Sequence, residues 1–179
     1  MMSINIVLTL TGTDRVGIVE EVTQLLLKLG GNIETSRMSR LGGEFAILML
    51  VSLPSDVSAS LDKAISELSA RGYKVTTTPT ESTYAKAHVG WQHYQIEVKG
   101  ADHEGIIHEI ARTLSRSGIS IEAMDTGTTG APNSGNPLFT MIALVTVPPH
   151  LPGRSWQEAL EEVGHGLDVD IQVLPVPRP

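Results

Sequence analysis

The segment Gly12-Thr-Asp-Arg-Val-Gly17-Ile18 decides the fold, because it returns 88 residues later as Gly100-Ala-Asp-His-Glu-Gly105-Ile106. Aligned without gaps, residues 12–34 and 100–122 are identical at nine of 23 positions. Unrelated segments of ordinary composition match at roughly one position in fifteen. The chain therefore contains an internal duplication, and we expect two similar domains that carry the same glycine-containing loop.

Length and composition agree with two small soluble domains. A chain of 179 residues accommodates two such units, and we predict a first domain at 1–80, a linker at 81–92 and a second domain at 93–179. The sequence has no cysteine, no basic signal-peptide head and no apolar run near the ~20 residues of a membrane span. We therefore predict a cytoplasmic protein.

The charge balance argues against a direct nucleic-acid binder. Thirteen basic residues against 20 acidic ones give a net charge of −7, and aromatic residues make up only 4%. A DNA or RNA surface needs clustered lysine and arginine, and base stacking needs aromatic side chains. Any regulatory role is therefore expected to run through contact with another protein.

Hydrophobic periodicity predicts the order βαββαβ in both halves. Alternation predicts strands, and three- and four-residue spacing predicts helices. In the first half we predict strands at 4–10, 32–41, 44–53 and 73–78 and helices at about 19–29 and 57–72. In the second half we predict strands at 93–99, 119–126, 138–147 and 168–174, helices at about 107–118 and from 155, and a flexible loop at 127–136. The expected class is α+β: two ferredoxin-like βαββαβ domains, each an antiparallel four-stranded sheet with two helices on one face.

The third strand of each half is apolar on both pleat faces. Residues 45–51 and 139–145 lack the alternation of a half-exposed strand. One interpretation is that the sister domain or a second chain covers the face without helices, so we expect a homo-oligomer. The other is a central strand built from strong β-formers.

The repeated loop offers partners to both ends of a small amino acid. It lies where a strand turns into a helix, so it exposes backbone N–H groups that carry partial positive charge and suit a carboxylate. Gly17 and Gly105 have no Cβ and allow close approach. Asp14 and Asp102 supply a charge opposite to that of an ammonium group, and Asn32 adds an amide.

A structural interpretation explains the same residues. The two aspartates are also good N-caps, and the two glycines could serve only close packing of helix on sheet. The candidate ligand-binding residues are Asp14, Arg15, Val16, Gly17, Ile18, Asn32 and Ile33 in the first half and Asp102, His103, Gly105 and Ile106 in the second.

Several short motifs in order resemble the ACT domain family. They are Gly-x-Asp-Arg-x-Gly-Ile-Val from Gly12, Gly-x-Asn-Ile-Glu-x-Ser-Arg ending at Arg37, Leu41-Gly-Gly-Glu-Phe45 and Met49-Leu-Val-Ser52. Two such domains without an attached enzyme resemble the glycine cleavage system transcriptional repressor family. In the second half His103 replaces Arg15 and Ser120 replaces Asn32.

The resemblance implies a ferredoxin-like fold that binds a small amino acid, with glycine favoured, at the loop around Gly17. It also implies an output through contact with a transcriptional activator protein. We expect no enzymatic activity, no cofactor and no metal.

Two other functions are compatible with the same βαββαβ order. A small acyl-phosphate hydrolase shares the βαββαβ order and would use Arg15 and Asn32 on a phosphate. A ligand-free dimerisation module is the third possibility. His103, His108 and Glu109 lie close in sequence, but their spacing is not the i, i+4 spacing of a helical metal site.

Overall fold

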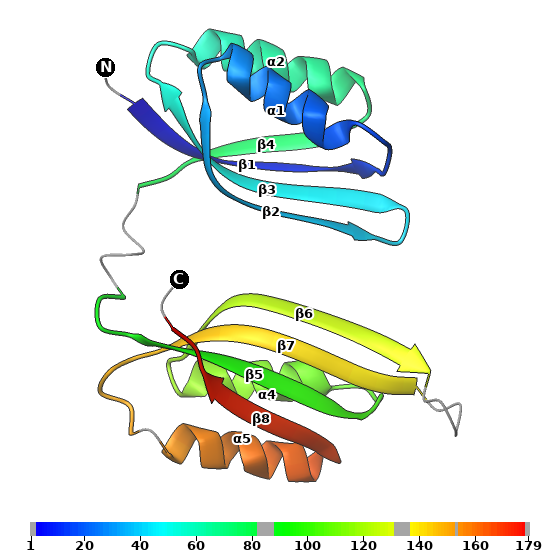
Figure 1. Cartoon of the computed structure of the whole chain (residues 1–179), viewed down its shortest axis with the longest axis vertical. Helices are drawn as coiled ribbons and strands as arrows, with labels where there is room; N and C mark the ends of the chain where they lie inside the picture. The colour runs from blue at the N-terminus through cyan, green and yellow to red at the C-terminus, as the bar shows by residue number, and fades with distance from the viewer. Residues whose placement is uncertain (1–2, 82–87, 131–136, 153, 178–179) are drawn as a thin grey trace. The chain divides into compact units, whose positions relative to one another are not determined.

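The computed structural model describes residues 3–81, 88–130, 137–152 and 154–177. The chain divides into two compact units, Met1–Thr83 and Tyr84–Pro179, and Figure 1 shows the ribbon of both. The elements of the first unit are β1 (Ser3–Thr13), α1 (Ile18–Lys28), β2 (Asn32–Leu41), β3 (Glu44–Pro54), α2 (Ser58–Ala70) and β4 (Lys74–Pro79). Those of the second are β5 (Gln92–Ala101), α4 (Ile106–Arg116), β6 (Ser120–Gly130), β7 (Pro137–Val147), α5 (Ser155–Gly166) and β8 (Val169–Pro175).

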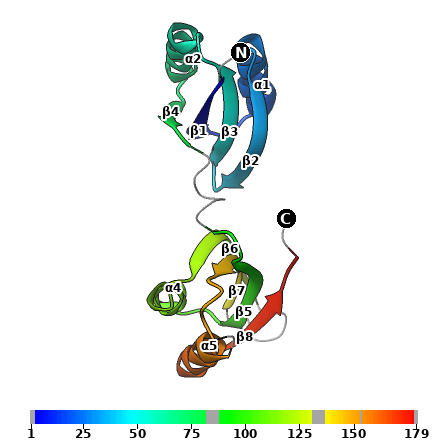
Figure 2. The ribbon, with the colours of Figure 1, turned by 90° about the vertical axis from the view of Figure 1, so that its left-hand side faces the viewer.

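Each unit is an antiparallel four-stranded sheet with both helices on one face, as predicted. The strand orders are β2-β3-β1-β4 and β6-β7-β5-β8, and the two views of Figures 1 and 2 show each helix pair on a single side of its sheet. The predicted fold class, two ferredoxin-like βαββαβ domains, is therefore confirmed.

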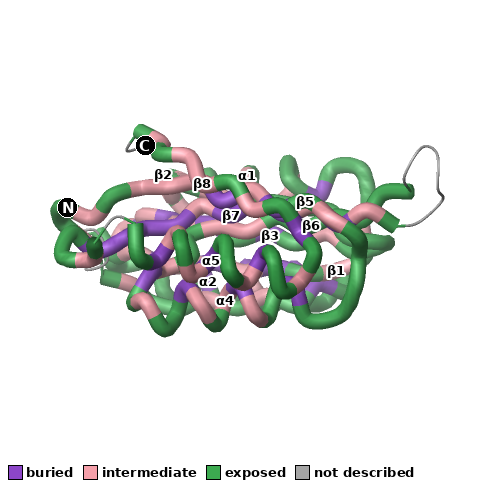
Figure 3. The backbone as a smooth tube through the Cα atoms, turned by 90° about the horizontal axis from the view of Figure 1, so that it is seen from below, coloured by how far each residue is buried: buried purple, intermediate pink, exposed green. Residues whose placement is uncertain are grey.

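The core of each unit lies between its helices and its sheet. In β3 the side chains of Ile47, Met49, Val51 and Leu53 are buried, whereas Leu48 between them is 46% exposed. The same alternation runs through β7 up to Val145, and Figure 3 shows purple buried segments within the strands. The third strands are apolar on both faces in sequence, but the face away from the helices is largely not buried, with Thr146 at the end of β7 as an exception.

Two pairs of identical residues in the duplicated segment lie at the same backbone feature in both units. Gly30 and Gly118 adopt positive φ angles of 71° and 69° just after α1 and α4, where a glycine C-cap is expected. Glu34 and Glu122 lie where the pairing register shifts, between Ile33 and Thr35 and between Ile121 and Ala123. Both edge strands therefore carry a β-bulge at the same repeat position.

The first glycine of each motif is required for packing. A Cβ on Gly12 would lie 2.5 Å from the Tyr73 ring, and one on Gly100 would lie 2.8 Å from the Asp168 carbonyl oxygen. In both units this glycine lets the first strand approach the start of the last strand.

The prediction of a loop over residues 127–136 is wrong for its first part. Residues 127–130 continue β6 and pair with β7, from Gly127 opposite Thr140 to Gly130 opposite Pro137. Two threonines in this stretch favour a strand, and the partner strand is long enough to pair with it. Residues 131–136 lie outside the described part of the chain.

Candidate functional site

The two repeated loops have the same backbone. The amide of Asp14 donates to the Gly43 carbonyl at 2.9 Å, and the amide of Asp102 donates to the Pro137 carbonyl at 3.0 Å. Each bond ties the loop to the hairpin of its own unit. The loop then turns into the helix at Gly17 or Gly105.

Gly17 and Gly105 are the N-cap residues, and their φ angles of 92° and 94° require glycine. Neither helix has a side-chain cap, and a Cβ on either glycine would meet no atom within 4 Å. The structural interpretation of the sequence is therefore wrong on both points. Asp14 and Asp102 are not the N-caps, because the glycines occupy that position, and the glycines do not serve close packing.

The uncapped helix start of the first unit leaves backbone donors available. The first helical hydrogen bond runs from the Glu21 amide to the Gly17 carbonyl at 3.0 Å. By helix geometry, the amides of Ile18, Val19 and Glu20 precede that bond and have no partner within the helix. These donors carry the positive end of the helix dipole.

The Asp14 carboxylate, three residues before the N-cap Gly17 in sequence, is only loosely paired. Its Oδ2 atom is 3.8 Å from Nε of Arg40 on β2, whose side chain is 68% exposed. A contact of this length between an exposed arginine and a half-buried aspartate is weak. The Asp102 carboxylate accepts a long hydrogen bond of 3.5 Å from the Thr128 hydroxyl on β6.

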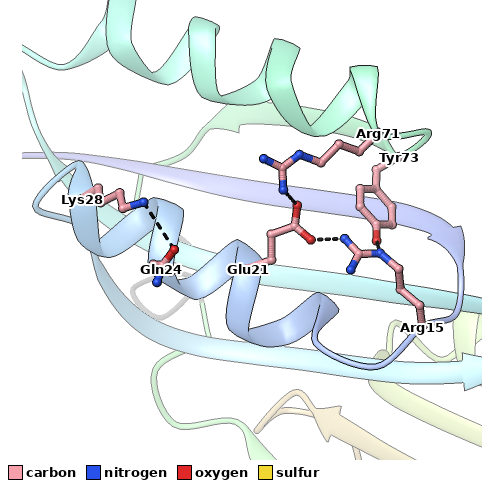
Figure 4. A network of polar contacts seen from close by, with 6 residues as sticks. All are labelled: Arg15, Glu21, Gln24, Lys28, Arg71 and Tyr73. Carbon is pink, nitrogen blue, oxygen red and sulfur yellow. Dashed lines mark hydrogen bonds and ion pairs between the residues drawn. The ribbon is translucent and has the colours of Figure 1, made fainter.

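Arg15 is bound within its own unit. Its guanidinium donates to the Tyr73 hydroxyl and to Glu21 on α1, and Glu21 also binds Arg71 beyond the end of α2 (Figure 4). The hydrogen bond to Glu21, and after it the one to Tyr73, raise the pKa of Arg15 above its ordinary value. The guanidinium carbon lies 5.4 Å from the centre of the Tyr73 ring, within cation–π range. Arg15 therefore holds the loop against the helices and the start of β4.

His103 takes the corresponding position in the second unit. Its Nδ1 atom lies 3.0 Å from the Glu104 carbonyl oxygen, and its Nε2 atom lies 2.6 Å from the Leu167 carbonyl oxygen after α5. The contact with Leu167, and after it the contact with Glu104, raise the pKa of His103 above its ordinary value. The repeat of Glu21, Glu109, binds Arg112 on its own helix at 2.5 Å instead.

The remaining loop residues divide between surface and core. Val16 is 101% exposed, whereas Ile18 and its repeat Ile106 are 3% and 2% exposed and belong to the cores. The two isoleucines anchor the first helical turn to the sheet. Their side chains are therefore not available to a ligand at the loop surface.

The structure separates Asn32 and Ile33 from the first loop. Asn32 follows the far end of α1, which at 11 residues is about 16 Å long. Along the sheet, Thr13 pairs with Glu44 and Asn32 pairs with Ser52, eight residues or about 27 Å further along β3. Asn32 and Ile33 instead line a separate hollow of about 510 Å³ beside the C-terminal half of α1.

The second loop lines a hollow of its own. It measures about 490 Å³ and is bounded by residues 102–108 and by Phe139 on β7. All four predicted residues of this half, Asp102, His103, Gly105 and Ile106, contribute to its wall.

Two further structural findings concern the described residues. No group of three or more histidine, aspartate or glutamate side chains among them could hold a metal ion. No helix in the described part of the chain is long and apolar enough to cross a membrane.

Sequence reasoning missed three residues that hold the loops, Glu21, Tyr73 and Leu167. Glu21 could have been found from the repeat, because an identical residue, Glu109, occupies its position in the second half. Tyr73 was visible only as the first residue of a predicted strand. Leu167 acts through its backbone carbonyl, so no side-chain pattern marks it.

Comparisons with known proteins identify the class of the chain. The ACT domain model matches residues 5–73. The crystal structure of an unknown protein from Galdieria sulphuraria superposes with a TM-score of 0.86 at 32% identity, over 98% of this chain and 100% of that one. The first unit is therefore an ACT domain, and the second unit repeats its βαββαβ fold.

Two of the similar proteins carry the name of a glycine cleavage system transcriptional repressor, one of them provisionally. The glycine cleavage system transcriptional repressor of Escherichia coli (strain K12) is 47% identical over 47 residues, which is 26% of this chain and 25% of that protein. The match thus spans only about a quarter of the curated relative. The structure of a protein provisionally assigned as such a repressor superposes over 99% of this chain and 100% of that one with a TM-score of 0.73, at 21% identity, and supports the shared fold.

Proposed function

We propose that the protein is a cytoplasmic, amino-acid-sensing regulator without catalytic activity. It binds glycine or another small amino acid at the loop between β1 and α1, and it controls a transcription factor by protein–protein contact. The resemblance to glycine cleavage repressors suggests the ligand and the type of output.

The observation that carries the proposal is the open, uncapped start of α1. A Cβ placed on Gly17 would have no atom within 4 Å, so a small carboxylate can reach the free amides of the first turn. Asp14 lies three residues before Gly17 in sequence and is only weakly paired, so it is available to an ammonium group. The loop thus supports a zwitterion with charges of both signs, and no side chain of the unit fills the place of the missing Cβ.

The second loop has the same features and in addition a defined hollow. Gly105 is equally open, Asp102 is exposed, and the hollow of about 490 Å³ exceeds the volume of a single small amino acid. We therefore include Asp102, His103, Gly105 and Ile106 as a second candidate binding region.

The geometry disfavours the acyl-phosphate hydrolase. That reaction would need Arg15 and Asn32 at one phosphate, but in this unit they lie at opposite ends of α1. Arg15 is also engaged by Glu21 and Tyr73. Assay with acetyl phosphate is expected to show no hydrolysis above background; hydrolysis that disappears in Arg15→Ala would overturn this assignment.

Ligand size sets the affinity range. Glycine has five heavy atoms, and at a ceiling of about −1.5 kcal/mol per atom its binding free energy is limited to roughly −7.5 kcal/mol. This corresponds to a Kd no lower than a few micromolar. We expect calorimetry to give a Kd between the micromolar and millimolar ranges; a nanomolar value would contradict the simple loop site.

A thermal-shift screen of the twenty amino acids tests the sensor directly. Glycine or another small amino acid is expected to raise the melting temperature, and Asp14→Ala is expected to abolish the shift. Asp62→Ala is the matched control, because Asp62 is an exposed acid on α2, away from the loop. If no amino acid shifts the melting temperature, the ligand-free dimerisation module becomes the better assignment.

A DNA-binding assay on the isolated chain tests whether its regulatory output needs a partner protein. Because the net charge is −7 and no basic cluster stands out, the isolated chain should not bind a fluorescent DNA duplex in an anisotropy titration at low salt. Salt-sensitive binding of the duplex by the chain alone would show that no activator partner is needed for DNA contact.

A further inference from the structure

Both ring nitrogens of His103 face backbone carbonyl oxygens. The Nε2 contact with Leu167 spans 2.6 Å and joins two segments 64 residues apart, and the Nδ1 contact with Glu104 spans 3.0 Å. A carbonyl oxygen can only accept a hydrogen bond. Both nitrogens must therefore carry protons for both bonds to form, and that is the charged imidazolium.

The charges around the ring favour the same protonation state. Asp102 on the loop itself and Asp168 on the connection between α5 and β8 are acidic and act on the ring electrostatically. They add to the effect of the two carbonyls in raising the pKa of His103, whereas partial desolvation opposes it.

We propose that His103 is a protonation-dependent clamp that fixes the second loop, residues 102–105, to the connection between α5 and β8. As the imidazolium it donates to Leu167 and Glu104 together. As the neutral imidazole it has one N–H and must give up one of the two bonds. Loss of the Leu167 bond detaches the loop from the far segment.

The first unit has an anchor at the same repeat position that does not titrate near neutral pH. Arg15, the repeat of His103, reaches Tyr73 just before β4, as His103 reaches Leu167 just before β8. A guanidinium stays charged at every physiological pH. The duplication has therefore produced one loop whose anchor is the same at all pH values and one loop whose anchor loses one of its two hydrogen bonds above the pKa of its histidine.

The clamp bears on the hollow at the second loop, because His103 forms part of its wall. Release of the ring removes a fixed boundary of that hollow. Ligand access at the second loop is then a function of pH, whereas access at the first loop is not. The clamp itself follows from the unliganded geometry and does not depend on the proposed ligand.

The direct test is a pH titration of the full-length protein by NMR, without any ligand. At pH 6 both ring nitrogens of His103 are expected to carry protons. The Asp168 amide, which shares a peptide group with the Leu167 carbonyl, should shift with the same midpoint as the ring. That midpoint should lie above the ordinary pKa of a histidine side chain. A neutral ring at pH 6, or an Asp168 amide that does not follow the ring, would overturn the proposal.

Substitutions separate the clamp from a merely structural role. In His103→Gln at pH 6, hydrogen exchange of the Asp102 amide should be about fivefold faster than in the wild type, after correction for intrinsic exchange rates. This is the size of effect expected when one hydrogen bond is lost. The difference should vanish at pH 9. In His103→Arg the Asp102 amide should be protected at both pH values, whereas His108→Gln should behave like the wild type. A difference between wild type and His103→Gln that is the same at both pH values would contradict the proposal, and it would leave the glycine assignment at the first loop untouched.

Discussion

The two loops are copies of one motif, but they are held by different chemistry. The first is fixed by a permanent charge, Arg15, within a network that includes Glu21 and Tyr73. The second is fixed by His103 on two carbonyl oxygens. The backbone, the positive φ glycine and the uncapped helix are the same in both. The comparison shows that the loop conformation survives a change of its anchoring side chain as long as a donor reaches the segment before the last strand.

The largest expected difference between the units concerns the first glycine of the motif. In Gly100→Ala the new Cβ meets backbone atoms of Asp168 and Val169 at 2.8 Å, whereas in Gly12→Ala it meets the ring of Tyr73 at 2.5 Å. A ring can rotate away more easily than backbone can move, so we expect a loss of about 3 kcal/mol for Gly100→Ala and about 1–2 kcal/mol for Gly12→Ala.

Urea denaturation can measure the two units separately. Both tryptophans, Trp91 and Trp156, belong to the second unit, and Trp156 is buried. Tryptophan fluorescence therefore reports on Gly100→Ala, and hydrogen exchange of β1 amides reports on Gly12→Ala. Equal losses would mean that the backbone around Asp168 adapts as readily as the Tyr73 side chain.

The next largest effect is expected for Gly17→Ala, which tests whether the positive φ angle at the N-cap requires glycine. Gly17→Ala places a Cβ at a φ of 92°, which an alanine adopts only under strain, so we expect a loss of about 1–2 kcal/mol. Gly43→Ala is the matched control, because a Cβ there also meets no atom within 4 Å but the φ angle is not positive. If both variants were equally stable, the glycine would have to be explained by ligand access alone.

Much of this architecture was predictable because it depends on local pattern and on the repeat. The strand and helix order, the bounds of β2 at Asn32–Leu41 and the glycine stops after α1 and α4 follow from periodicity and turn chemistry. The position of Asn32 could also have been derived. A helix of 11 residues carries its ends about 16 Å apart, so a residue after the helix cannot share a site with the loop before it in the same unit.

The anchors of the loops could not be predicted in the same way. Tyr73 lies 58 residues from Arg15, and Leu167 lies 64 residues from His103. Such pairs depend on how the last strand meets the first, and no local spacing encodes that distance. Gly12 and Gly100 show the same limit, because their role depends on which atoms of the far segment come close.

A smaller effect is expected from the glutamates that the repeat shares. Glu21→Gln removes two ion pairs that join α1 to Arg15 and Arg71, whereas Glu109→Gln removes only a pair within α4. Both arginines of the first network are about half exposed, so the expected change in the unfolding equilibrium is about two- to fivefold for Glu21→Gln and under about twofold for Glu109→Gln. The comparison should be made at low salt by hydrogen exchange. If the difference persists at 1 M salt, it does not arise from the ion pairs.

The variant with the smallest expected effect on stability, Arg40→Gln, distinguishes two orientations of the bound ligand. Arg40→Gln removes a 3.8 Å contact between an exposed arginine and the half-buried Asp14, and it should change stability by less than about 0.5 kcal/mol. If Asp14 binds the ammonium group of glycine, the loss of the competing guanidinium should tighten binding by up to about threefold in calorimetry. Thr128→Val, which removes the 3.5 Å contact with Asp102 in the second loop, is the matched variant. A tenfold loss of affinity in Arg40→Gln would instead place the ligand carboxylate on Arg40, and the helix amides would then no longer be its partner.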